Sequence, residues 1–297
     1  MKKSTAEKTA IKDAIGGDKL YQQRARNALP RLVRQAKAEQ PIYYSDLAQE
    51  LRMPNPRNLN YVLGTIGNAL IDLGEYEKRE IPPLQSLVIS KNTDMPGEGF
   101  EGFLVDRATY RKSSRKRKRI IIHQLHDTIF QYERWDEVLD FFGLEPVKIK
   151  LKSPKKPPGR GKGGKYGGGE ESKEHKRLKN FISKNPQIIG LPKKVAPGKV
   201  EYELPSADKI DVMFNNGDEL VGVEVKSINS GENDLARGIY QCVKYSALIE
   251  AVQMVNQKKL KSRTILVIEG ELPPDIIELK NILGVEAMGI DPLKSGK

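Results

Sequence analysis

Cysteine is almost absent from this sequence of 297 residues, in which Cys242 is the only one. A single thiol excludes a disulfide within the chain and a zinc site built from several cysteines. No apolar run approaches the roughly 18 residues that a membrane-spanning helix needs, and no apolar segment of the secretory kind follows Met1. We therefore expect a soluble, cytoplasmic protein without membrane contact.

Acidic residues are missing from two segments that carry much of the positive charge. Residues 111–119 hold seven cations in nine positions, and residues 148–165 hold eight. The formal net charge is +12, so the rest of the chain is mildly acidic. Clustered cations attract polyanions through a long-range field, although such runs also occur as solvated loops. We expect DNA as the partner. The expected contacts in the first cluster are Arg115, Lys116, Arg117, Lys118 and Arg119.

Proline and glycine occur at almost every second position from Ser153 to Gly169. This composition is typical of a flexible linker. The length of the chain also exceeds the usual size of one domain. We therefore predict a helical, DNA-binding domain over residues 1–150, a basic linker over 151–170 and a second domain over 171–297.

Helical periodicity dominates the first predicted domain. Residues 20–38 are amphipathic, but Pro30 interrupts them, which predicts a kink or two helices. Ser45 is placed to cap a short helix, and Pro56 to begin a longer helix that Gly74 ends. Two helices across a turn are the skeleton of a helix-turn-helix, and also of many ordinary helical scaffolds.

Two short apolar segments and a further helix complete this domain. Residues 87–90 and 102–105 are candidates for wing strands, with a glycine-rich turn between them. Residues 120–142 keep helical periodicity and contain Trp135, the single tryptophan. The expected fold of the domain is mostly α-helical and winged-helix-like.

Strand and helix patterns alternate in the second predicted domain, which indicates an α/β fold with a small sheet flanked by helices. The expected helices are residues 172–183, 231–255 and 275–282. The expected strands are residues 208–214, 220–227, 264–268 and 285–290. Asn216 and Gly217 lie between the first two strands and are typical of a hairpin turn.

Charged residues interrupt the valine-rich second strand of this hairpin. Side chains alternate along a strand, so the three valines at 221, 223 and 225 share one face, and Glu224 and Lys226 share the other. Charges on an otherwise apolar strand are costly unless they are paired or bind something. The strand therefore predicts either a salt-bridged edge or a binding site.

Asp211 lies on the partner strand of the hairpin. A four-residue loop would place it opposite Glu224, whereas a two-residue loop would place it opposite Gly222. Two carboxylates and a backbone carbonyl suit Mg²⁺, for which Mn²⁺ would substitute, because Mg²⁺ prefers hard oxygen ligands. Such an ion polarises a scissile phosphate and activates a water. Lys226 would orient that water, help to deprotonate it or stabilise the developing charge.

The order Asp211 … Glu224-Val225-Lys226 resembles the signature of the PD-(D/E)xK superfamily of restriction-endonuclease-like nucleases. Ile210 stands where that motif has its proline, which leaves Asp208 as an alternative metal-binding acid. The resemblance covers about residues 171–291 and implies a restriction-endonuclease-like α/β fold for this domain.

Gln241 and Tyr245 lie one helical turn apart and resemble the Gln-x-x-x-Tyr motif of one branch of that superfamily. The branch tends to carry an acid in its first helix, for which Glu174 is the match and Glu171 the alternative. The metal ligands that the resemblance implies are Glu174, Asp211 and Glu224. The catalytic residues that it implies are Asp211, Glu224, Lys226, Gln241 and Tyr245. Arg237 and Lys244 share the helical face of Gln241 and are further expected DNA contacts.

The resemblance implies a magnesium-dependent DNA endonuclease that hydrolyses phosphodiester bonds, and by family association a role in restriction or antiphage defence. A homodimer would supply two active sites for duplex cleavage. One alternative is a catalytically inactive DNA-binding protein or regulatory subunit with a nuclease-like fold. Another is an RNA-directed nuclease, which the few aromatic residues in the basic runs disfavour. No small-molecule cofactor is evident.

Overall fold

The structure of the protein is a computed structural model that describes residues 5–97, 99–104, 106–148, 172–257 and 260–292. The chain divides into two compact units, Met1–Lys148 and Ile149–Lys297. The expected linker, residues 151–170, lies outside the described residues. Among the helices described, none combines the length and the apolar character that a membrane span requires.

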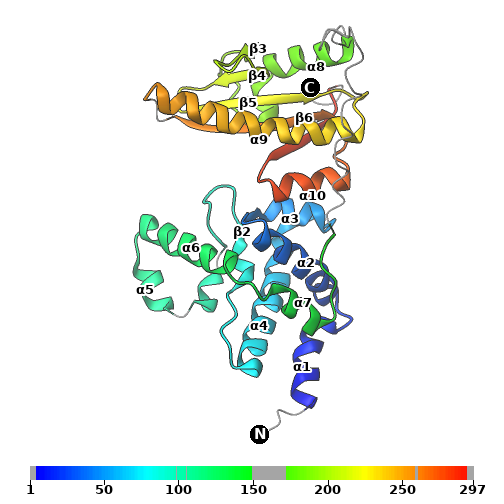
Figure 1. Ribbon diagram of the computed structural model, residues 1–297, viewed down its shortest axis with the longest axis vertical. Helices are drawn as coiled ribbons and strands as arrows, with labels where there is room; N and C mark the ends of the chain where they lie inside the picture. The colour runs from blue at the N-terminus through cyan, green and yellow to red at the C-terminus, as the bar shows by residue number, and fades with distance from the viewer. Residues whose placement is uncertain (1–4, 98, 105, 149–171, 258–259, 293–297) are drawn as a thin grey trace, which may run out of the picture. The chain divides into compact units, whose positions relative to one another are not determined.

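The N-terminal unit is helical, and its two longest helices, α2 (Leu20–Lys37) and α4 (Leu59–Glu77), pack against each other (Figure 1). Apolar residues recur on them at helical spacing, so each buries one stripe in a shared core. The other helices are α1 (Thr5–Gly16), α3 (Tyr44–Glu50), α5 (Arg107–Lys112), α6 (Arg115–Phe130) and α7 (Trp135–Phe142). Three 3₁₀ turns, η1 (Pro56–Asn58), η2 (Leu84–Leu87) and η3 (Phe100–Phe103), and two short strands, β1 (Ile42–Tyr43) and β2 (Val88–Ile89), complete the described elements.

Three helix boundaries expected from single residues are wrong. The two-helix alternative at Pro30 is wrong, because α2 is continuous and buries Pro30 and its neighbours in the core. Ser45 is not an N-cap, since α3 begins one residue earlier, at Tyr44. Gly74 does not end α4, which continues until Lys78 adopts a left-handed conformation with φ of 54°. In each case packing of the surrounding helix outweighs the local preference of one residue.

The winged-helix expectation is also wrong for its second strand. Gly102 and Phe103 belong to η3, and Val105 lies outside the described residues. The first expected strand is present as β2, but it pairs in parallel with β1 in a two-stranded sheet. The single helix expected over residues 120–142 is two helices, α6 and α7, and α6 begins inside the basic cluster at Arg115. The N-terminal unit is therefore a helical core with a small parallel ladder.

The C-terminal unit contains a mixed sheet of five strands in the order β3-β4-β5-β6-β7. The first three strands are antiparallel, and β5, β6 and β7 are parallel. Its strands are β3 (Lys199–Glu203), β4 (Lys209–Asn215), β5 (Glu219–Lys226), β6 (Lys261–Glu269) and β7 (Glu286–Ile290). Its helices are α8 (Lys173–Lys184), α9 (Glu232–Val255) and α10 (Pro274–Ile282), with a 3₁₀ turn, η4 (Pro186–Ile189). The α/β class is as expected; β3 was not expected from the sequence.

Helices cover both faces of this sheet (Figure 1). On one face the valines at 221, 223 and 225 pack against Leu178 and Ile182 of α8. On the other face α9 and α10 bury an apolar cluster that includes Leu235, Ile239 and Leu266. The sequence periodicities of 2 and 3.6 account for both layers. The residues of β5 that alternate with its valines face α9, and this is where the charged pair lies.

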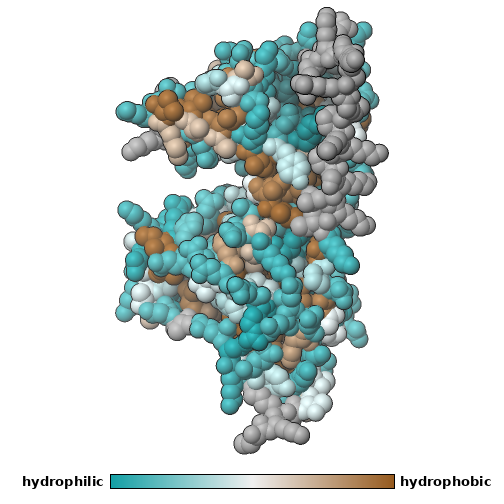
Figure 2. Space-filling model, in the orientation of Figure 1, coloured by the Kyte–Doolittle hydropathy of each residue, from teal (hydrophilic) through white to brown (hydrophobic). Residues whose placement is uncertain are grey.

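Apolar side chains also reach the surface at the end of α9. Met254 and Val255 are 77% and 83% exposed, and Figure 2 shows hydrophobic surface over this end of the helix. Val243 is 40% exposed. The buried stripe of α9 instead includes Cys242, one residue away on the helix. The buried positions of α9 therefore run from Leu235 to Gln253, and the last two residues of the helix are exposed.

Candidate functional site

The β4–β5 hairpin has the register that the four-residue loop predicted. Val212 pairs with Val223 and Asn215 with Leu220. Asn216 shapes the loop, because its Oδ1 accepts hydrogen bonds from the amides of Asp218 and Glu219. The same register places Asp211 opposite Glu224, one step beyond the last pair. The hairpin therefore brings together the two carboxylates that the sequence singled out.

The alternation of β4 is broken at Asp211. Ile210 and Met213 pack in the same cluster on the α9 face, although three positions separate them in sequence. The residue opposite Asp211 on β3 is Glu201, which has a φ of 52°. Asp211 Oδ2 accepts a hydrogen bond of 2.8 Å from the amide of Val225. At this irregularity Asp211 leaves the regular pairing of the strands, and its carboxylate points toward the end of β5.

Two side chains of α8 contact Asp211. His175 Nε2 lies 3.4 Å from Asp211 Oδ2, and Lys179 Nζ lies 3.8 Å from Oδ1. Lys179 is 2% exposed and also pairs with Glu201. One turn of helix separates the two residues, so they share a face of α8. The first helix of the unit thus supplies cationic or titratable groups to Asp211.

Glu224 is a buried carboxyl group with 3% of its surface exposed. Burial and the nearby charge of Asp211 raise its pKa to about 7, against the opposing effect of Lys226. Both causes disfavour a second negative charge in a dry site. Asp211 and Glu224 are therefore close enough to repel one another, and a divalent cation would relieve that repulsion.

Lys226 lies beside Glu224 on the same face of β5. Its Nζ is 3.0 Å from Glu224 Oε1 and 3.4 Å from Asp234 Oδ1. Burial lowers the pKa of Lys226, but Glu224 and the other acids outweigh burial, and the net shift is upward. Lys226 is therefore an ammonium ion at neutral pH. This charge state suits the stabilisation of negative charge and does not suit the removal of a proton from water.

A glycine of α9 makes room for this lysine. A Cβ atom at Gly238 would lie 2.8 Å from Cδ1 of Leu266 and 3.1 Å from Cε of Lys226. Both distances are shorter than ordinary carbon contacts. Gly238 therefore lets the helix approach the sheet closely enough to hold the stem of Lys226 in place.

Gln241 and Tyr245 extend the site along α9. Gln241 Oε1 lies 3.4 Å from Lys226 Nζ, and its Nε2 lies 3.5 Å from Tyr245 Oη. Tyr245 donates a 2.9 Å hydrogen bond to the carbonyl of Lys209. Burial, followed by the charge of Glu224, raises the pKa of Tyr245, so its hydroxyl stays protonated. The Gln-x-x-x-Tyr pair therefore joins the hairpin through a chain of polar contacts.

Other expected site residues lie apart from this cluster. Asp208, the alternative metal ligand, pairs with Lys244 and accepts a hydrogen bond from Ser206 at the surface. Lys244 and Arg237 are exposed, with 55% and 68% of their side-chain surface accessible. No hydrogen bond or ion pair among the described residues joins Glu174 to either carboxylate. Glu171 lies outside the described residues.

Lys179 is a site residue that sequence reasoning missed, and His175 is one that it did not assign to the site. The expected helical acid, Glu174, is half-buried in the first turn of α8, next to His175. A signal was present, because His175 and Lys179 are four residues apart and flank Leu178, whose side chain faces the core. From this spacing, both residues would have been predicted to lie at the edge of the buried face of α8.

The side chains of this cluster fit a magnesium site in which the protein supplies only a few of the ligands. Mg²⁺ is commonly held by one or two carboxylates, with water and phosphate oxygens completing its shell. Asp211 and Glu224 supply two carboxylates, and burial followed by the charge of Asp211 raises the pKa of Glu224. No cluster of three or more His, Cys, Asp or Glu side chains suited to a metal occurs in the described parts of the chain. The fit is therefore to a two-carboxylate site.

Comparison with known proteins gives no relative for this arrangement. No protein-family model, no curated protein and no solved structure matches the chain. The function of the protein is therefore inferred from the geometry of the site.

The pH dependence of stability tests the repulsion at Glu224. The folded-state pKa of Glu224 is about 7, above the ordinary value of 4.5, so the folded state binds more protons than the unfolded state between these values. The free energy of unfolding therefore falls as pH rises from about 5 to 8. Glu224→Gln cannot ionise and should not show this fall. In EDTA, the free energy of unfolding of the variant minus that of wild type should therefore rise by about 1–3 kcal/mol between pH 5 and 8. Urea unfolding of the C-terminal unit, followed by circular dichroism, measures it. A constant difference would contradict the repulsion.

Close packing at Gly238 predicts a cost for one added methyl group. Alanine gains helix propensity of up to about 1 kcal/mol over glycine, but overpacking a core costs about 1–3 kcal/mol. Gly238→Ala should therefore leave the C-terminal unit unchanged or less stable by up to about 2 kcal/mol. The matched control is Gly64→Ala in α4, where a Cβ atom would meet nothing within 4 Å, and which should gain stability. Equal stabilisation of both variants, measured by urea unfolding, would contradict the packing argument.

Proposed function

We propose that the protein is a metal-dependent DNA endonuclease with a restriction-endonuclease-like C-terminal domain of the PD-(D/E)xK type. The observation that carries the proposal is the opposition of Asp211 and Glu224 across the β4–β5 hairpin, with Lys226 beside them. Two acids and a lysine at one end of a sheet suit phosphodiester hydrolysis. The setting we propose is restriction or antiphage defence, with a homodimer supplying two active sites for duplex cleavage.

Each residue of the site has a separate task in this proposal. Asp211 and Glu224 hold the divalent ion, and a bound Mg²⁺ supplies Lewis acidity toward the phosphate and its attacking water. The Val225 amide fixes Asp211 Oδ2 through its 2.8 Å hydrogen bond. Lys226, charged at neutral pH, stabilises the negative charge that grows on a non-bridging phosphate oxygen. His175, whose Nε2 lies 3.4 Å from Asp211 Oδ2, would contact the same phosphate group.

Gln241 and Tyr245 position the lysine and the substrate. The carboxamide oxygen of Gln241 accepts from Lys226, so it limits the directions that the ammonium group takes. The hydroxyl of Tyr245 is anchored to the backbone at Lys209. These contacts orient donors before the substrate arrives, which is the property that makes electrostatic stabilisation effective.

The basic start of α6 is the surface that we propose for DNA. Residues 115–119 are all cationic and occupy the N-terminal end of the helix, where the backbone dipole is already positive. No acidic residue in the first turn compensates them. Ser114 caps the helix by accepting from the amide of Arg117. A polyanion at this end would relieve the repulsion and bind both the side chains and the helix terminus.

A non-catalytic DNA-binding protein is the second candidate, and one observation favours it. Lys179 is buried and lies 3.8 Å from Asp211, so a protein cation partly neutralises the acid that a metal would need. Lys226 is likewise held by Glu224 and Asp234. A structural ion-pair network of this kind needs no substrate. Activity measurements separate the two candidates.

Cleavage of plasmid DNA tests the catalytic proposal. Wild type should cut in Mg²⁺ or Mn²⁺ and not in EDTA. Lys226→Met keeps the length of the buried stem but removes the charge, and Asp211→Asn removes one ligand. Each should lower the cleavage rate at least 100-fold, the scale at which a single charge-stabilising group acts. Agarose-gel quantification over time measures the rates.

The control for these variants is Lys261→Ala. Lys261 is an exposed cation at one end of the β5–β6 ladder, and Lys226 lies at the other end. Loss of Lys261 should leave the cleavage rate unchanged. DNA binding should persist in all variants. Intact plasmid with wild type in every metal, together with retained DNA binding, would reject the catalytic proposal and support the binding protein.

The salt dependence of binding tests the α6 surface. Each neutralised phosphate contributes about 0.9 to the slope of log K against log salt concentration. The triple variant Lys116→Ala, Arg117→Ala, Arg119→Ala should therefore reduce the slope by roughly 2–3. The control removes the same charge from the other unit through Lys193→Ala, Lys194→Ala and Lys199→Ala. Equal slopes for the two triple variants, measured by fluorescence anisotropy, would exclude α6 as the DNA surface.

A further inference from the structure

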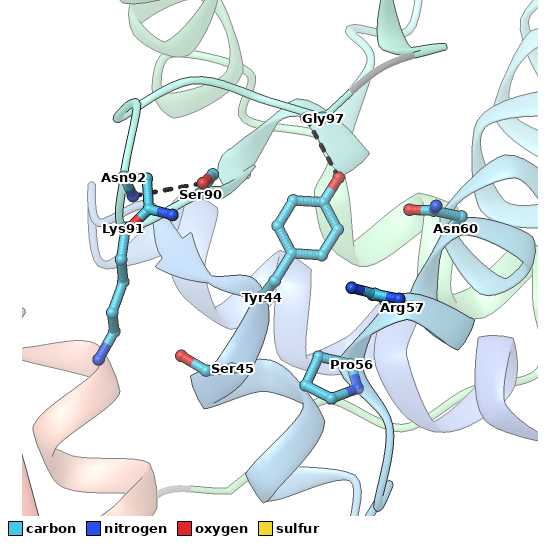
Figure 3. Close-up of a pocket in the computed structure, with 9 residues that line it drawn as sticks. All are labelled: Tyr44, Ser45, Pro56, Arg57, Asn60, Ser90, Lys91, Asn92 and Gly97. Carbon is cyan, nitrogen blue, oxygen red and sulfur yellow. Dashed lines mark hydrogen bonds between the residues drawn. The ribbon is translucent and has the colours of Figure 1, made fainter.

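A cavity of the N-terminal unit lies outside the site described above. It has a volume of about 610 Å³ and lies between the start of α3, the start of α4 and the segment that follows β2. Figure 3 shows Tyr44 at its centre, with Arg57 and Asn60 on one side and Ser90 and Lys91 on the other. The Tyr44 hydroxyl accepts a hydrogen bond of 3.3 Å from the amide of Gly97. The volume is in the range of small-molecule sites.

A smaller hollow of about 190 Å³ shares Tyr44, Asn60 and Gly97 with this cavity. Phe100 and Phe103 form an aromatic part of its wall. Gly64 of α4 also lines it, and a Cβ atom at that position would meet nothing within 4 Å. The hollow is therefore open space beside two aromatic rings, and it extends the larger cavity inward.

Gln85 lines the smaller hollow with an unsatisfied side chain. Gln85 is 5% exposed, and within the described residues neither its Oε1 nor its Nε2 has a hydrogen-bond partner. Gly67 provides the room for this carboxamide, because a Cβ there would lie 2.5 Å from Gln85 Nε2. Buried polar groups are paired in the great majority of cases. A buried amide that adjoins an open hollow is therefore placed to bind a ligand.

The outer part of the cavity carries positive charge. The described residues offer no hydrogen bond or ion pair to the guanidinium of Arg57, which is exposed. Lys91 lies 3.6 Å from Asp46 and 5.1 Å from the centre of the Tyr43 ring, so its charge is partly compensated. Arg57 is the cation that remains for an anionic group, and a guanidinium suits phosphate geometry.

We propose that this cavity binds a nucleotide. Its base enters the smaller hollow beside Phe100 and Phe103, and Gln85 pairs with the edge of the base. A carboxamide offers one acceptor and two donors in a plane, which matches the N6 and N7 edge of adenine. The phosphate lies at Arg57. The source of the nucleotide is a free mononucleotide or a nucleotide of a single DNA strand whose base is unstacked.

Calorimetric titration of the full chain with AMP, with adenosine and with a single-stranded oligodeoxyadenylate tests this site. AMP or the oligonucleotide should bind, and AMP should bind at least tenfold more tightly than adenosine if the free mononucleotide is the source. Arg57→Ala should weaken binding of either phosphate-bearing ligand at least fivefold. Arg24→Ala removes a cation of α2 that does not line the cavity, and it should leave binding unchanged.

Two variants separate binding from folding. Gly64→Leu fills the hollow and should abolish binding, whereas Gly64→Ala, the matched control, should retain most of it. Gln85→Leu removes two unpaired buried atoms, so the melting temperature of the N-terminal unit should not fall, while affinity falls at least tenfold. The single Trp135 is buried in this unit, so its fluorescence follows unfolding.

The source of the ligand follows from the two arms. Binding of AMP indicates a free nucleotide, and binding of the oligonucleotide alone indicates a base from DNA. Either result supports the site if Gly64→Leu and Gln85→Leu no longer bind the ligand. Absence of binding by AMP and oligonucleotide at millimolar concentration overturns the proposal. Binding that persists in both variants also overturns it, since the ligand then lies elsewhere.

Discussion

The repulsion between two carboxylates in a dry site is the constraint on which the C-terminal unit depends. Asp211 and Glu224 face one another across a hairpin, and Lys226, Lys179 and His175 surround them. Burial and proximity raise the pKa of Glu224 to about 7. A fold selected for stability alone would favour apolar residues here. In the proposed function, a divalent cation bound by this acid pair would offset the repulsion.

Contacts with neighbouring strands and helices fix the position of Asp211 and of the lysine beside Glu224. The irregular position of Asp211 brings its Oδ2 to the Val225 amide, and the closeness of α9 at Gly238 confines the stem of Lys226. Gln241 and Tyr245 then connect the lysine to the backbone at Lys209. Because these groups belong to a packed sheet and helix, the fold fixes their positions. In the proposed function they would be in place before a substrate binds. Such preorganisation is what an electrostatic site requires.

The N-terminal unit has a helical core that leaves a cavity. The carboxamide of Gln85 lies at the inner end of this cavity and the guanidinium of Arg57 at its mouth, and neither has a hydrogen-bond partner among the described residues. The basic end of α6 provides a separate polyanion surface in the same unit. Together with the catalytic site proposed for the C-terminal unit, these two features would couple recognition of nucleic acid, or of a nucleotide, to hydrolysis.

The sequence by itself determined most elements of the C-terminal unit and the shared face of Glu224 and Lys226, because periodicity is a property of neighbouring residues. It left the loop length open and chose Glu174 where the structure brings His175 and Lys179 to Asp211. It also placed helix boundaries wrongly at Pro30, Ser45 and Gly74, where packing outweighed the local preference of each residue. Only the tertiary structure decided the position of Asp211, the burial of Glu224 and the cavity at Gln85. These depend on contacts between distant segments, and local pattern carries no information about such contacts.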